Sequence, residues 1–268
     1  MNNKISIIGL GWLGLALAKK CRSAGMQVFG TTTTKEKCKK LRSTGIDASV
    51  WTLGSDLPKS LQRSSIYMIN IPPSKTDHYM EGVVDLISAI PKSAFVIFCS
   101  SSSVYGNQWG CLDENSELSP GRRSSEVLIE TEVYLQESIE KRLCVLRLAG
   151  LIGPRRHPIF SLSGRNTSFA NDESVNLVHL DDCISIIMKL IYGWQEGRRD
   201  ESVVGVYNLS SGEKYTKGHY YKLMAQRFGI VPPIYMETEQ PSPERYISNH
   251  LARTRFNHTF KSILEYKL

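Results

Sequence analysis

The sequence lacks several of the motifs that assign a function on their own. Its six cysteines form no CxxC pair and none of the spacings typical of a zinc site, so neither a metal centre nor a redox-active dithiol is indicated. No G-x-S-x-G sequence is present, which leaves a serine-hydrolase interpretation without its nucleophile elbow. Scattered cysteines are typical of reduced thiols, and we therefore expect a cytoplasmic protein without bound metal.

Long runs of one residue type are also absent. The apolar stretch after Lys4 imitates a secretory signal but is too short to cross a bilayer, and we interpret it as a strand, a glycine turn and a helix. The net charge of +7 is spread over short clusters with no interleaved aromatic residues. We expect neither a nucleic-acid partner nor a membrane partner.

What the chain does contain is an alternation of two patterns. Runs rich in isoleucine and valine alternate with segments of helical periodicity, which predicts βαβ units and a parallel sheet covered on both faces. The predicted strands are 4–9, 26–31, 48–53, 65–71, 94–100 and 143–150, and the predicted helices are 12–24, 35–44, 75–90 and 122–140. The expected fold class is α/β, with a Rossmann-type doubly wound parallel sheet.

After Gly150 the loops become longer, and we expect a small lobe there. One helix follows "VNLVHLDD", a strand is predicted at 205–210, and the helix within 215–229 ends at Gly229. The predicted division is a sheet domain of residues 1–155 plus 174–210 and a C-terminal substrate-binding lobe of residues 156–173 plus 211–268. Because ligands of open α/β sheets bind beyond the carboxyl ends of the strands, a lobe at that edge would close a cleft.

The strongest local motif is "GLGWLG", which directly follows the first predicted strand and opens a helix. Its first glycine suits a tight turn, its second lets a pyrophosphate approach the backbone, and its third lets the helix pack against the strand. This context predicts a dinucleotide-binding loop. The expected cofactor-binding residues are Gly9, Gly11, Trp12, Leu13 and Gly14, joined by Ile71, Pro72 and Ser100 after later strands.

The end of the second predicted strand favours NADP(H) over NAD(H). An NAD site usually has an Asp or Glu about 20 residues after the glycine loop. Here "TTTTKEK" follows, and its first carboxylate is Glu36. We expect a 2′-phosphate to bind Thr31, Thr32, Thr33 and Lys35. The alternative is that the threonines form a turn and cap a helix, which would leave NAD(H) open.

The motifs "GLGWLG", "SSSVYG", "RLAGLIGPRR", "VNLVHLDD" and "VYNLSSG", in this order, resemble the extended short-chain dehydrogenase/reductase superfamily. The resemblance spans nearly the whole chain and is nearest to the atypical YeeZ-like group. It implies an NAD(P)-dependent oxidoreductase or epimerase/dehydratase-like enzyme acting on a small polar substrate such as a nucleotide sugar. The plain glycine loop also fits β-hydroxyacid dehydrogenases, but the βα pattern that continues through "VLRLAG" argues against their all-helical second domain.

The resemblance supplies only half of the family's catalytic site. It assigns Ser101 to the hydroxyl that hydrogen-bonds the reacting oxygen of the substrate. The family's tyrosine and lysine, one helical turn apart, are replaced by Ser124 and Leu128. Leu128 belongs to a mainly apolar helical stripe, so we expect it to pack inward. A serine without an adjacent base is a poor proton donor near neutral pH.

Other side chains are therefore candidates for the missing proton donor. We name Tyr105 and Tyr79 as candidate catalytic groups. The alternatives are packing or substrate contact for Tyr105 and core packing for Tyr79, and we expect His78 to face solvent. In "GPRRHP", Arg155, Arg156 and His157 are candidates for binding an anionic substrate group, against the alternative of an exposed basic loop.

Three further polar residues, His179, Asp181 and Asp182, are expected to anchor a helix N-terminus rather than bind metal. The second functional interpretation is a non-catalytic NADP(H)-binding redox sensor. A homodimer is left open.

Overall fold

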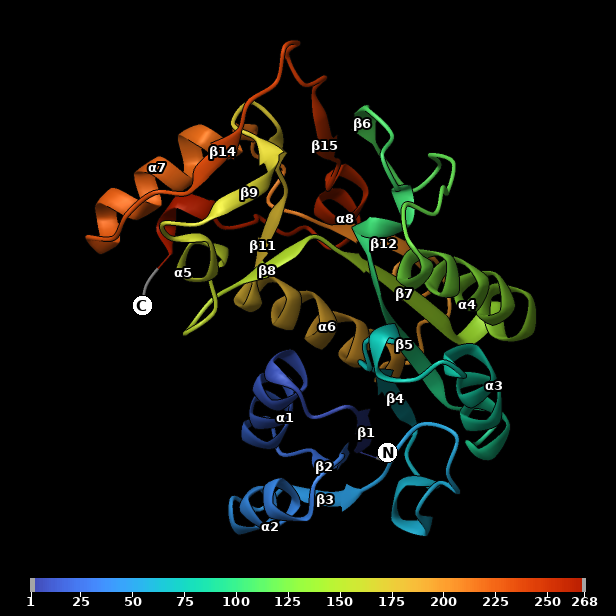
Figure 1. Ribbon diagram of the computed structural model, residues 1–268. Helices are drawn as coiled ribbons and strands as arrows, with labels where there is room; N and C mark the ends of the chain where they lie inside the picture. The colour runs from blue at the N-terminus through green and yellow to red at the C-terminus, as the bar shows by residue number, and fades with distance from the viewer. Residues whose placement is uncertain (1–2, 267–268) are drawn as a thin grey trace.

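The computed structural model describes residues 3–266 and has a seven-stranded, all-parallel sheet at its centre (Figure 1). The strands lie in the order β12-β7-β5-β4-β1-β2-β3, and the order reverses between β1 and β4. Their bounds are β1 Lys4–Ile8, β2 Gln27–Thr32, β3 Asp47–Val50, β4 Ile66–Ile69, β5 Phe95–Ser101, β7 Leu143–Leu148 and β12 Gly205–Leu209. This topology confirms the predicted Rossmann-type fold class.

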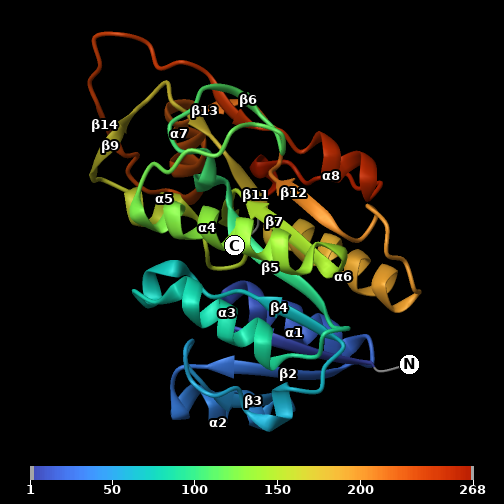
Figure 2. The same cartoon turned by 90° about the vertical axis from the view of Figure 1, so that its right-hand side faces the viewer.

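Helices cover both faces of the sheet, and each face has its own hydrophobic cluster. Helices α1 (Trp12–Ser23), α2 (Lys35–Ser43) and α6 (Leu180–Gln195) contribute to one cluster, and α3 (Tyr79–Ala89) and α4 (Arg123–Ile139) to the other (Figure 2). Successive residues of β5 alternate between the clusters, since Ile97 belongs to the first and Phe98 to the second. A sheet buried on both faces explains why its strands are continuous apolar runs.

Local chemistry explains where several helices begin and end. Thr34 caps α2 by accepting a hydrogen bond from the Lys37 N–H. Helix α7 (Lys217–Phe228) ends at Gly229, which adopts the left-handed conformation with φ +63°. Helix α3 begins at Tyr79, later than the predicted residue 75, because the prolines Pro72 and Pro73 start a separate 3₁₀ turn.

Short elements fill the space beyond the sheet. They are the strand pairs β8 (Gly150–Ile152) with β11 (Leu177–His179), β9 (Asn166–Ala170) with β14 (Ile234–Met236), β10 (Ser174–Val175) with β13 (Tyr215–Thr216) and β6 (Gly110–Leu112) with β15 (Arg245–Ile247), and helices α5 (Pro158–Leu162) and α8 (His250–Arg255). A third cluster from residues 152–266 forms the core of those around α5 and α7, whereas β6, β15 and α8 contribute to the two clusters of the sheet. Five 3₁₀ turns complete the described part of the chain: η1 Lys59–Leu61, η2 Pro73–Lys75, η3 Ser102–Tyr105, η4 Glu140–Arg142 and η5 Ile263–Glu265.

These small strands were not predicted, because two to five residues are too few to show a period. In both views α5, α7, β9 and β14 gather at one end of the molecule (Figures 1 and 2). The exact lobe boundaries stay a prediction.

All six cysteines are free thiols. Within residues 3–266, no helix is long and apolar enough to cross a membrane, and no three His, Cys, Asp or Glu side chains are grouped as a metal site.

Candidate functional site

The glycine loop has the geometry of a phosphate cradle. Gly9 has φ +101°, and a Cβ there would lie 2.5 Å from the Asn70 carbonyl oxygen. A Cβ on Gly14 would lie 2.3 Å from the Gly9 carbonyl oxygen, whereas a Cβ on Gly11 would have no atom within 4 Å. No side chain among residues 3–266 caps α1, so its first backbone N–H groups are available to an anion. The loop therefore has no room for a side chain at Gly9 or Gly14, whereas the space beside Gly11 is open.

Thr31 supports this cradle from within. Its Oγ1 accepts a hydrogen bond from the Gly9 N–H at 2.8 Å, and its carbonyl accepts one from the Leu10 N–H at 2.8 Å. The side chain is buried, as is that of Thr32. The expectation that the Thr31 hydroxyl faces a ribose phosphate is corrected by this geometry, whereas the same expectation for Thr32 stays a prediction. Thr33 and Lys35 are exposed and retain that role as candidates.

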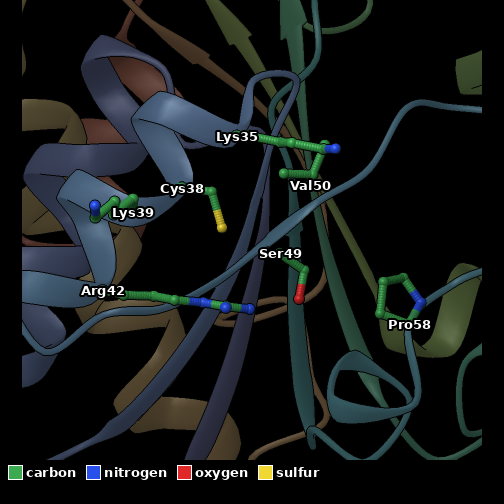
Figure 3. A pocket seen from close by; sticks show the side chains of 7 residues that line it. All are labelled: Lys35, Cys38, Lys39, Arg42, Ser49, Val50 and Pro58. Carbon is green, nitrogen blue, oxygen red and sulfur yellow. The ribbon is translucent and has the colours of Figure 1, made fainter.

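A basic groove of about 510 Å³ begins at Lys35 and was not predicted (Figure 3). It is lined by Lys35, Cys38, Lys39, Arg42, Ser49, Val50 and Pro58, among which there is no carboxylate. Lys35 reaches from the start of α2 toward Val50 at the end of β3. The spacing of the basic residues in "KEKCKKLR", which repeats with the helical period, is the sequence signal that could have found this groove.

Ser101 lies at the carboxyl end of β5 and is half-buried. Its Oγ accepts a hydrogen bond from the Ser103 N–H at 3.1 Å and so caps η3. Because the hydroxyl acts there only as an acceptor, its proton remains available to an oxygen of a bound molecule. The neighbouring Ser100 is buried, and its Oγ has no hydrogen-bond partner within residues 3–266.

Tyr105 is fully buried and belongs to a polar network. Its hydroxyl donates to Asn208 Oδ1 at 2.8 Å and accepts from Arg147 Nη1 at 3.0 Å. Arg147 also forms a buried ion pair with Glu132, with Nη2 and Oε2 2.7 Å apart. Burial raises the pKa of Tyr105, and the nearby Arg147 charge offsets this only in part. These contacts anchor η3 beneath Ser101, and they correct the expectation that Tyr105 is a catalytic acid.

Tyr79 is also a core residue. It is 1% exposed, and its hydroxyl donates to the Ile71 carbonyl oxygen at 2.9 Å. Burial raises the pKa of Tyr79, which disfavours a phenolate. The contact instead fixes the segment after β4, where Ile71 is half-buried and Pro72 is exposed. His78 is exposed, as expected.

His157 lies inside the lobe rather than at a substrate surface. Its Nδ1 accepts a hydrogen bond from the Ile159 N–H at 3.1 Å, so the proton of the neutral ring is on Nε2. Nε2 then donates to the Tyr220 hydroxyl at 2.7 Å, and that hydroxyl donates to the Ile263 carbonyl. Burial, with a smaller contribution from His179, lowers the pKa of His157 to about 4. The expectation of substrate binding by His157 is therefore wrong.

This burial predicts a pH-dependent stability. As pH falls below 6.5 the unfolded histidine binds a proton, whereas the native one does so only near 4, so the free energy of unfolding falls across this window. We expect His157 to contribute a loss of about 3 kcal/mol, as judged from the shift in pKa. Urea denaturation at several pH values checks this. In His157→Asn, which retains a capping oxygen, this part of the loss should vanish; an unchanged pH dependence would contradict the assignment.

The polar residues at the start of α6 fasten the C-terminal segment. Asp181 and Asp182 lie in the first turn of α6, as expected. Asp182 is buried and accepts hydrogen bonds from His258 Nε2 at 2.9 Å and the Lys261 N–H at 3.1 Å. His179 Nε2 donates to the Ser262 carbonyl at 2.9 Å. Their roles are thus structural.

Helix α4 carries no tyrosine–lysine pair at the end of the sheet. Ser124 is half-buried in its first turn, and Leu128 packs in the cluster between α3 and α4. None of the twelve tyrosines of the chain has a lysine four residues after it. Of the predicted site residues, the glycine loop directly follows β1 and Ser101 ends β5, so both lie at the carboxyl ends of the parallel strands.

Known proteins share this architecture and parts of the sequence. Residues 4–109 match the family model of the NAD-binding domain of 6-phosphogluconate dehydrogenase. Among solved structures, MoeE5 in complex with UDP-glucose and NAD has a TM-score of 0.77 at 19% identity over 97% of this chain and 94% of that one. The Bacillus cereus UDP-glucuronic acid 4-epimerase in complex with NAD has a TM-score of 0.75 at 16% identity, with the same coverage. These likenesses show the fold.

A nearer relative shows the family. The protein YeeZ of Escherichia coli (strain K12) is 32% identical over 245 residues, which cover 86% of this chain and 85% of YeeZ. The match to the 6-phosphogluconate dehydrogenase domain ends before β7 and β12, which extend the parallel sheet instead of starting an all-helical domain. The chain therefore belongs to the YeeZ family.

Proposed function

We propose that this protein binds NADP(H) and is an atypical oxidoreductase or epimerase/dehydratase-like enzyme of the cytoplasm. The observation that carries the proposal is the glycine loop, where Gly9 and Gly14 have no room for a side chain while Gly11 faces open space before an uncapped helix. This arrangement fits a diphosphate bound to backbone N–H groups. The family model matched by residues 4–109 supports a nicotinamide dinucleotide.

Ser101 is the residue we propose to orient the substrate. Its hydroxyl proton is free to hydrogen-bond a carbonyl or hydroxyl oxygen at the carboxyl end of β5. A bound nicotinamide supplies a hydride donor or acceptor. The UDP-sugars bound by MoeE5 and by the Bacillus cereus epimerase support a small polar substrate such as a nucleotide sugar.

A non-catalytic redox sensor is the second candidate, and one observation favours it. Tyr79, Tyr105 and His157 are all buried and hydrogen-bonded, so none of them is placed to transfer a proton to a molecule bound beside Ser101. Incubation with NADPH and a panel of nucleotide sugars and carbonyl compounds separates the two functions. Turnover that is lost in Ser101→Ala supports the enzyme, whereas tight binding without turnover supports the sensor.

The cofactor preference is tested by titration with NADPH and NADH. Thr33 and Lys35 lie exposed at the end of β2 without a carboxylate to bind a ribose 2′-hydroxyl, so we expect tighter binding of NADPH. Lys35→Glu should weaken NADPH binding by about tenfold or more, because a charge-assisted hydrogen bond contributes about 1.5–3 kcal/mol. NADH binding should change little. Equal affinities of the wild-type protein for both dinucleotides would contradict the preference.

A further inference from the structure

The turn between β8 and α5 is fastened to the start of the dinucleotide-binding helix. Trp12, the first residue of α1, donates a hydrogen bond from Nε1 to the Pro154 carbonyl oxygen at 3.1 Å. The Arg156 guanidinium lies over the Trp12 ring, with 5.1 Å between Cζ and the ring centroid. In Figure 1 the β8–α5 loop descends toward α1. Two segments about 140 residues apart in sequence thus meet at the glycine loop.

The backbone of this turn is tightly defined. Gly153 and Arg156 exchange two backbone hydrogen bonds of 3.0 and 2.8 Å, which leaves Pro154 and Arg155 at the tip. Arg155 adopts φ +59°, a conformation uncommon for residues other than glycine. A Cβ on Gly153 would lie 3.0 Å from Trp12 Cη2, so the turn can approach the indole only because this residue is glycine.

The charges around the glycine loop point to the role of this turn. The segment Gly9–Leu17 contains no cationic residue, although a dinucleotide diphosphate carries two negative charges. Arg156 is exposed, and its guanidinium forms no ion pair with any residue from 3 to 266 but lies over the Trp12 ring. A guanidinium stacked on an aromatic ring keeps its N–H groups free for phosphate oxygens.

We propose that Arg156 binds the diphosphate of the dinucleotide, and that Trp12 is the positioning residue that holds its guanidinium there. This inference rests on the proposed dinucleotide binding. It moves Arg156 from the expected substrate site to the cofactor site. Because His157 follows directly and caps α5 inside the lobe, the bound diphosphate also ties the lobe to the sheet domain.

The test compares Arg156→Ala with Arg253→Ala, a change at an exposed arginine of α8. The ligands are NADPH and adenosine 2′-monophosphate, which lacks the diphosphate. Arg156→Ala should weaken NADPH binding by about 10- to 100-fold, which corresponds to the loss of a charged hydrogen bond of about 1.5–3 kcal/mol. The affinity for adenosine 2′-monophosphate should not change. Arg253→Ala should change neither. Trp12→Leu should weaken NADPH binding by a smaller factor, because the guanidinium loses its platform.

The outcomes separate the inference from the function on which it rests. Wild-type affinity for NADPH in Arg156→Ala would overturn the inference alone, and weakened binding of a UDP-sugar in that variant would return Arg156 to the substrate site. Equal weakening of NADPH and adenosine 2′-monophosphate would also overturn it, because the loss would then be structural. A wild-type protein that binds no dinucleotide would overturn the proposed function itself.

Discussion

Gly11→Ala should leave the protein as stable as the wild type and yet weaken NADPH binding by about 10- to 100-fold. A Cβ on Gly11 meets no atom within 4 Å, and the residue has φ −73°, which alanine adopts without strain. The added methyl group would occupy the space where a diphosphate must approach the backbone N–H groups, whose charged hydrogen bonds contribute about 1.5–3 kcal/mol each. Thermal unfolding and NADPH titration measure the two effects.

Gly14→Ala provides the contrast. The added Cβ would lie 2.3 Å from the Gly9 carbonyl oxygen, and backbone cannot move aside as a flexible side chain can. We expect a loss of about 1–3 kcal/mol of stability, the usual cost of overpacking. If Gly11→Ala proved as unstable as Gly14→Ala, or bound NADPH like the wild type, the open space above Gly11 would not be the diphosphate site.

Arg147→Met should destabilise the protein by about 3–5 kcal/mol, because it leaves the Glu132 carboxylate buried without its cation. The two side chains are 4% and 0% exposed, and three hydrogen bonds join the guanidinium to the carboxylate. Burial alone would lower the pKa of Arg147, but the Glu132 charge outweighs it and raises the pKa. Urea denaturation gives the free energy of unfolding.

The double variant Glu132→Leu/Arg147→Met is the matched control. It removes both charges together, so most of the lost stability should return. Single and double variants that are equally unstable would show that the ion pair is not the cause. Because Arg147 also holds Tyr105 in the turn capped by Ser101, the single variant should disturb Ser101 even where the protein remains folded.

The main elements of the fold could be predicted because their signals are local. Apolar runs mark the buried strands, and a glycine loop between a strand and a helix shows its role within six residues. The side strands of the lobe could not be predicted, because each is short and pairs with a distant segment. The pairing of β6 with β15, for example, joins residues 110–112 to residues 245–247.

The roles of the candidate side chains were harder to predict, because their contacts also involve residues that are distant in the sequence. Tyr105 was predicted as a candidate catalytic group because the sequence does not show its hydrogen-bond partner, Asn208, which lies 103 positions away in the chain. His157 was expected in a basic loop, yet its Nε2–H group donates a hydrogen bond to Tyr220, 63 positions later in the chain. Thr31 sits where a ribose contact was expected, but its hydroxyl is bonded to the Gly9 N–H. Hydrogen-bond partners of this kind follow from the tertiary fold and leave no local pattern.

A crystal structure with NADPH bound tests the central claim most directly. The account predicts the diphosphate above Gly11 and the first turn of α1, the 2′-phosphate beside Lys35, and nicotinamide C4 facing the Ser101 hydroxyl across the space for a substrate. A diphosphate bound away from Gly11, or a nicotinamide turned away from the carboxyl end of β5, would contradict it.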